Sequence, residues 1–360
     1  MPPYFNGITF ETPLELDDRH WGRLGEITTP VVIRVVFGRD TEPELYRPVL
    51  QKLRALTLPD GRRKVYVLGE LLDSDFLARY RWECDKTPGC TFDESGSAAY
   101  HDYKTRITRY VDALDEWVDI WEVGNEVNGE WADESCVKDS KDSCRYKKVG
   151  GKRVPLTPAR PDITADKIRF AIDKVLEKKK PVALTLMHMP ECTTWDDNTM
   201  FEWAEANLKP KLGGVTLDYL LVSYYEDNCD KGKLTIVKED RRRLPEQNRR
   251  SLYWNGIFDR LAGLFADVKA DVKHVGFGEI GYSSDTVTCP KDELSFCDKK
   301  TKKNPRSKLT ILNRYHGLQI YTPEYLGGHF WWTAQEDILY DGFYSALKSN
   351  FKAVVWSVRE

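Results

Sequence analysis

Short apolar runs alternate with amphipathic helical patterns from one end of this 360-residue chain to the other. The runs are mostly apolar on both faces, which is typical of parallel strands covered by helices. We predict eight strands, at residues 4–10, 31–37, 64–71, 119–125, 182–188, 219–225, 274–278 and 328–332. Eight such strands indicate an α/β fold, a single (β/α)8 or TIM barrel that spans residues 1–360.

Helical patterns lie between these runs, for example at residues 44–56, 98–117, 165–178, 250–268 and 309–321. No linker, repeat or low-complexity tract marks a domain boundary. A doubly wound open sheet is the alternative architecture. Such a sheet usually carries a glycine-rich phosphate turn after an early strand, and the sequence has none.

Composition and charge argue against several classes of function. Hydrophobic residues make up 41% of the chain and charged residues 31%, with a net charge of -3. These values are typical of a globular protein and argue against a general nucleic-acid binder. No run approaches the roughly 20 apolar residues of a membrane span. We therefore expect no nucleic-acid partner and no membrane span, and we favour a monomer.

The eight cysteines indicate a disulfide-bonded protein. Six are close neighbours in pairs and predict the bridges Cys84–Cys90, Cys136–Cys144 and Cys289–Cys297. Cys192 and Cys229 follow the fifth and sixth predicted strands, whose loops touch if the strands are adjacent in a barrel, so they predict a fourth bridge, Cys192–Cys229. A zinc site is the alternative, but the chain has no Cys-x-x-Cys pair.

Four disulfides imply an oxidising compartment, so we expect a secreted or extracellular protein. The segment from Met1 to Gly7 has no basic start and no apolar signal core, so a signal peptide is absent from this sequence. Either the protein is cytosolic or a signal has been removed, and the cysteines favour the second reading.

The segments after the third, fourth and seventh predicted strands are long, at residues 73–96, 128–162 and 282–307. In a barrel they lie on the carboxyl face, where substrate sites are built. The three bridges between close neighbours fall in these segments and would hold a cleft in shape. Basic residues are frequent in the second and third segments, which indicates either solvated loops or attraction of an anionic polysaccharide.

Two glutamates, Glu126 and Glu279, each stand where a buried apolar run passes into a polar, glycine-containing loop. An ionised carboxylate is costly at the end of a buried strand unless it has partners. A pair of acid/base groups at the carboxyl end of a parallel barrel accounts for both, and such a pair is what cleavage of a glycosidic bond requires. Buried ion pairs with Arg or Lys are the alternative.

Three strand-end motifs carry a family resemblance: Trp-Glu-Val-Gly-Asn-Glu at 121–126, Glu-Ile-Gly at 279–281 and Trp-Trp-Thr at 331–333. Together they resemble the clan of retaining (β/α)8 glycoside hydrolases with catalytic glutamates on strands four and seven, which includes cellulases, mannanases and β-xylosidases. The resemblance implies that Glu126 is the acid/base and Glu279 the nucleophile. It also implies a β-linked polysaccharide or oligosaccharide substrate, with no cofactor and no metal.

The same resemblance implies roles for residues around the two glutamates. Asn125 would bond the sugar 2-hydroxyl, and Tyr225, or alternatively Tyr224, would bond the nucleophile. Arg34 lies within an apolar run and needs a partner, which is either Glu279 or Glu122. His188 would donate to a substrate hydroxyl or a carboxylate, or would simply pack behind the site. Ser223 stands where the clan often has His.

Tryptophans complete the predicted site. Strand alternation turns only one of Trp331 and Trp332 inward, and the clan pattern selects Trp332 as the platform beneath the sugar, because an indole face stacks on sugar C–H groups. Trp131, like Trp82 and Trp195, would form an outer sugar subsite or pack within its loop.

We favour endo-cleavage, since long loops can wall a cleft for several sugars. An exo-acting β-glycosidase and a transglycosylase are alternative enzymes, and a carbohydrate-binding protein on an inactive barrel is the alternative without catalysis.

Overall fold

The computed structural model describes residues 4–92, 100–134, 146–149, 152–155, 160–188, 200–225, 245–281, 305–332 and 334–357. Eight parallel strands close into a barrel and confirm the predicted (β/α)8 architecture. In barrel order they are β1 (Phe5–Phe10), β2 (Val31–Val36), β3 (Val65–Glu70), β7 (Ile120–Glu122), β10 (Val182–Met187), β11 (Thr216–Tyr224), β12 (Asp271–Ile280) and β13 (Gly327–Trp331).

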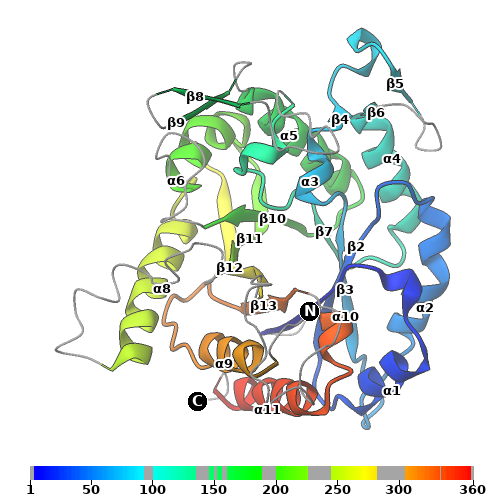
Figure 1. Ribbon diagram of the computed structural model, residues 1–360, viewed down its shortest axis with the longest axis vertical. Helices are drawn as coiled ribbons and strands as arrows, with labels where there is room; N and C mark the ends of the chain where they lie inside the picture. The colour runs from blue at the N-terminus through cyan, green and yellow to red at the C-terminus, as the bar shows by residue number, and fades with distance from the viewer. Residues whose placement is uncertain are drawn as a thin grey trace.

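Helices surround these strands (Figure 1). The longer ones are α1 (Asp18–Glu26), α2 (Arg47–Arg54), α4 (Tyr103–Leu114), α5 (Pro161–Glu177), α8 (Glu246–Ala262), α9 (Pro305–His316) and α11 (Asp341–Ser357). Short helices α3 (Ser74–Leu77), α6 (Met200–Trp203) and α10 (Ala334–Asp337) follow β3, β10 and β13. Five of the longer helices coincide with the predicted helical patterns, since the 3.6-residue period is a local signal.

Small strands project beyond the carboxyl end of the barrel, towards the top of Figure 1. They are β4 (Tyr80–Arg81), β5 (Cys90–Thr91) and β6 (Tyr100–Asp102) in one sheet, and the hairpin of β8 (Tyr146–Val149) and β9 (Lys152–Pro155). These sheets belong to the long segments after β3 and β7, the third and fourth barrel strands. The described parts of these two segments therefore lie on the face where the sequence predicted a substrate site.

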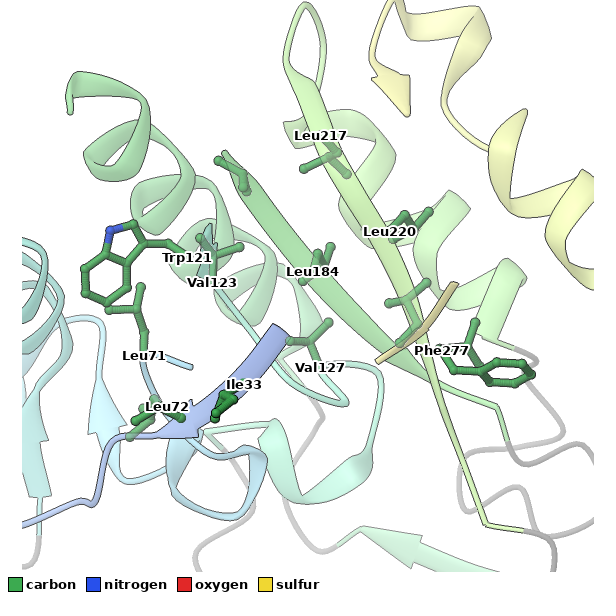
Figure 2. Packing of buried hydrophobic residues seen from close by; sticks show 14 of the residues in the cluster. Ile33, Leu71, Leu72, Trp121, Val123, Val127, Leu184, Leu217, Leu220 and Phe277 are labelled. Carbon is green, nitrogen blue, oxygen red and sulfur yellow. The ribbon is translucent and has the colours of Figure 1, made fainter. Parts of the chain in front are cut away.

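Two layers of apolar side chains hold the barrel together. Residues of the outer layer, such as Trp121, Leu184, Leu220 and Phe277, are buried between the strands and the helices (Figure 2). The inner layer fills the barrel with Phe5, Val32, Leu68, Ile120, Ala183, Tyr219, Leu221, Leu326 and Phe330. Side chains alternate along a strand, so residues two positions beyond this inner layer also point into the barrel.

That alternation assigns three charged residues to the interior. Arg34, Glu70 and Glu122 lie two positions beyond Val32, Leu68 and Ile120, and all three are fully buried. The apolar interior is thus topped by a charged layer at the carboxyl end of the strands.

An irregularity in β12 turns Glu279 towards this layer. Phe277 pairs with Val222, and Glu279 pairs with the very next residue of β11, Ser223, so Gly278 is an extra residue. A Cβ on Gly278 would lie 2.5 Å from the Thr185 hydroxyl oxygen, which shows that Gly278 also faces the barrel interior. A bulge of this kind redirects the side chain that follows it. Without it, strand alternation would turn Glu279 away from the interior.

The disulfide Cys84–Cys90 is present, with a Cα–Cα distance of 5.5 Å, in the segment after β3. The predicted bridges Cys136–Cys144, Cys192–Cys229 and Cys289–Cys297 lie outside the described residues, as does Trp195. Within the described ranges, no helix has the length and apolarity needed to cross a membrane.

Candidate active site

Arg34 is the centre of the charged layer. Its Nε lies 2.6 Å from Oε2 of Glu122, and Nη1 lies 3.0 Å from Oε2 of Glu279. The third nitrogen, Nη2, lies 3.0 Å from Oε2 of Glu70. The two partners that the sequence left as alternatives therefore both bind the guanidinium, and Glu70 joins them from the neighbouring strand.

Three donors converge on Glu279. Besides Arg34, the Asn125 amide donates to Oε2 at 3.2 Å, and the Tyr225 hydroxyl donates to Oε1. Burial raises the pKa of Glu279 above its usual value, whereas Arg34 and Tyr225 lower it. Hydrogen bonds to both oxygens favour the charged form. This carboxyl is equipped to act as an anion.

Glu126 lies in a different environment. It follows β7 in a turn closed by the Gly129 amide, and its φ of 48° places it in the left-handed region, which costs energy for a residue with a side chain. The Ser223 hydroxyl donates to Oε1. Burial, followed by the negative charge of Glu279, raises the pKa of Glu126 to about 8. Glu126 is therefore protonated at neutral pH.

The site is layered from buried to accessible. Arg34, Glu70 and Glu122 at its base are shielded from solvent, whereas Glu126 and Tyr225 are partly exposed. A molecule that approaches the carboxyl face can thus reach the protonated carboxyl without disturbing the charges below it.

The ends of β11 and β13 show how two pairs of neighbouring aromatic residues are oriented. Tyr225 contacts Glu279, whereas Tyr224 packs against Trp254 of α8 with a ring distance of 5.1 Å. Trp331 is buried, and its ring lies 5.2 Å from that of Phe343 in α11, as expected for a side chain that faces the helices.

Trp332 lies on the site side of β13. The Arg34 guanidinium lies 5.6 Å from its ring centroid, so the indole covers the charged layer. Partial exposure leaves part of this side chain open to a ligand.

The contacts that the structure describes for His188 and Trp131 are with residues other than the two glutamates. Nε2 of His188 pairs with the Tyr253 hydroxyl, and the His188 ring packs against Tyr224 and Trp254. Burial lowers the pKa of His188 to about 4, so the ring is neutral at pH 7. These contacts favour the packing alternative for His188. Trp131 is half-buried against the core, and its ring lies against Gly129.

Two residues of the site were not anticipated. Glu70 ends β3 as a buried carboxyl, and Thr185 donates from β10 to Oε1 of Glu122. Glu70 had the signal that identified Glu126 and Glu279, a carboxylate at the end of an apolar run. Ser223 was noted only as a departure from the clan pattern, and it contacts Glu126.

Comparison with solved structures shows the fold of the chain. An endo-1,4-beta-mannanase from Rhizomucor miehei superposes with a TM-score of 0.53 at 12% sequence identity, over 98% of this chain and 95% of that one. The chain has the fold of that mannanase. A GH113 beta-1,4-mannanase aligns over 97% of this chain and 99% of its own, with 13% identity and a TM-score of 0.46. No protein-family model and no curated protein matches the sequence.

Proposed function

We propose that the chain is a secreted, retaining glycoside hydrolase that cleaves β-linked polysaccharide, with endo-cleavage favoured. The observation that carries the proposal is the different surroundings of two carboxyls in one site. Burial and the charge of Glu279 raise the pKa of Glu126 to about 8, whereas three donors on Glu279 favour its ionised form against the effect of burial. One carboxyl that holds a proton and one that is supplied with donors on both oxygens are the acid and the nucleophile that a retaining glycosidase needs.

In the first step, Glu126 donates its proton to the glycosidic oxygen while Glu279 attacks the anomeric carbon. The bond to the leaving sugar breaks and a glycosyl ester forms on Glu279. In the second step, ionised Glu126 takes a proton from water, which attacks the same carbon and releases Glu279. The carboxyls of such a pair stand about 5 Å apart, whereas inverting enzymes need roughly 6.5–9.5 Å.

Neighbouring residues would orient the sugar. The Asn125 side-chain oxygen is buried and makes no hydrogen bond with the described part of the protein, so it is available to a sugar hydroxyl. Trp332 would stack beneath the ring. Trp131 stays a predicted outer sugar subsite, and a contact of His188 with a substrate hydroxyl stays a prediction. The mannanase that shares the fold acts on a β-1,4-linked glycan by its name, which makes β-mannans the first substrates to test.

Product analysis by mass spectrometry tests the proposal. Wild type and Glu279→Gln are incubated with neutral and anionic β-linked polysaccharides, including mannans, and we expect oligosaccharides from the wild type alone. Glu177→Gln, which changes an exposed glutamate at the end of α5, is the matched control and should behave as wild type. Undiminished turnover by Glu279→Gln would overturn the mechanism.

Azide rescue tests the two roles separately. Glu126→Ala lacks the acid/base, so azide should restore turnover of substrates with good leaving groups and give a glycosyl azide of retained configuration. Glu279→Ala lacks the nucleophile, so azide would attack directly and give the inverted product. The reverse pattern would exchange the two assignments, and no rescue of Glu126→Ala would count against the acid/base role.

A further inference from the structure

We propose that Glu70 is a positioning residue of this site, a carboxylic acid that stays neutral at the base of the charged layer and so leaves the charge of Arg34 to Glu279 and Glu122. Its link to catalysis rests on the proposed function, whereas its protonation state does not.

Glu70 is enclosed on all sides. It is the last residue of β3, pairs with Val36 of β2 and Glu122 of β7, and has no exposed surface. Nη2 of Arg34 lies 3.0 Å from its Oε2. Neither carboxyl oxygen of Glu70 accepts a hydrogen bond from the residues that the structure describes.

The other two carboxyls around Arg34 are far better supplied with donors. Glu122 receives Nε of Arg34 on one oxygen and the Thr185 hydroxyl on the other. Glu279 also has donors on both oxygens. A buried carboxylate is tolerated when donors satisfy its oxygens and is costly when they do not. Of the three carboxyls, Glu70 has the fewest hydrogen-bond donors to stabilise a negative charge. It is therefore the one that we expect to carry a proton.

The charge count favours such a proton. One guanidinium faces three buried carboxyls, so full ionisation would leave two uncompensated negative charges there, and a proton on one carboxyl reduces them to one. Burial raises the pKa of Glu70 well above its usual value, and the charges of Glu122, Asp73 and Glu279 raise it further against the opposing effect of Arg34. These are the charged groups that face Glu70 from β2, β7, β12 and its own following loop.

A neutral Glu70 suits both stages of the proposed reaction. With Glu279 ionised, Arg34 forms ion pairs with two carboxylates, Glu279 and Glu122. When Glu279 becomes an ester, Arg34 and Glu122 remain as a neutral pair, and no proton has to enter or leave the buried layer. An ionised Glu70 would instead compete with Glu279 for the guanidinium.

Infrared spectroscopy tests the protonation state without any substrate. Spectra are recorded at pH 9.5, above the pKa of Glu126, where a protonated carboxyl must belong to another group. We expect the wild type to show a carboxylic-acid C=O band that is lost in Glu70→Gln. Glu122→Gln is the matched control from the adjacent strand and should lose a carboxylate band instead. Loss of a carboxylate band in Glu70→Gln would overturn the proposal.

Two further readouts cover other outcomes. If Glu70→Gln does not fold, carbon-13 NMR of wild type labelled at the Glu carboxyls replaces the infrared comparison. It should show one resonance in the acid form at pH 9.5, and the absence of such a resonance would overturn the proposal.

The acidic limb of the pH–rate profile reports the ionisation of Glu279. If Glu70 is neutral, this limb should lie at the same pH in Glu70→Gln as in wild type, whatever the maximal rate. If Glu70 were ionised, its removal would take away a negative charge near Glu279 and move the limb to lower pH. If the wild type is inactive but shows the acid band, the proposed function is refuted, whereas the assignment of Glu70 as a neutral carboxylic acid stands.

Discussion

At the scale of single residues, the contact between Ser223 and Glu126 controls the proton that the proposed acid must carry. Burial and the charge of Glu279 raise the pKa of Glu126 to about 8, and the Ser223 hydrogen bond opposes them. Glu126 is protonated below this pH and ionises as the pH rises through it. The proposed activity should therefore fall on the alkaline side near pH 8.

Ser223→Ala should move this alkaline limb upward. Removal of the hydroxyl takes away a hydrogen bond that stabilises the ionised carboxylate, so the pKa of Glu126 rises. A hydrogen bond to a charged group is worth about 1.5 kcal/mol or more, which corresponds to a shift of about one pH unit. The pH dependence of kcat/KM measures it. Ser251→Ala removes a buried hydroxyl from α8 and is the control; equal limbs in wild type and Ser223→Ala would refute the role of Ser223.

At the scale of elements, Arg106 of α4 joins the carboxyl ends of two site strands. Its guanidinium is buried and donates to the carbonyls of Phe37 and Arg39 beyond β2 and of Leu71 beyond β3, at 3.0 to 3.1 Å. Because β2 carries Arg34 and β3 carries Glu70, one helix residue holds the two loops that follow the charged layer.

Arg106→Met should destabilise the protein by about 3 kcal/mol or more, since several buried carbonyls would lose their donors at about 1–3 kcal/mol each. Denaturant unfolding measures the loss. Arg109→Met is the matched control on the same helix, because Arg109 is partly exposed and pairs with Glu42, an interaction worth about 1 kcal/mol or less. Equal stability of the two variants would contradict the role of Arg106.

At the scale of the whole molecule, closure of the barrel brings the carboxyl ends of eight strands to one face. The residues that meet there come from β2, β3, β7, β10, β11 and β12. Arg34 and Glu279, for example, form a hydrogen bond although 245 positions separate them in the sequence. The described parts of the long segments after β3 and β7 extend from the same face, and Cys84–Cys90 lies in the first of them.

Thiol titration of the unfolded, unreduced protein tests the four predicted bridges together. We expect almost no free thiol before reduction and eight after it. Six free thiols before reduction would leave Cys84–Cys90 alone, and eight would remove all four bridges together with the argument for secretion.

Local patterns were enough to predict the barrel. Apolar runs and helical periods depend on neighbouring residues, so all eight strands could be read directly, although β7 ends at Glu122, four residues before Glu126, and β12 continues past Glu279. Glu70 is likewise a carboxylate at the end of an apolar run, but its role follows only from the residues that contact it across the barrel.

Partners across the barrel could not be read in this way. The three carboxyls on Arg34, the bond from Ser223 to Glu126 and the choice of Tyr225 over Tyr224 depend on strand register and on where each strand ends. The bulge at Gly278 reverses the direction that alternation gives to Glu279, and only the packing of β12 against β11 reveals it. Contacts between residues far apart in sequence follow from how the barrel closes, which no local pattern encodes.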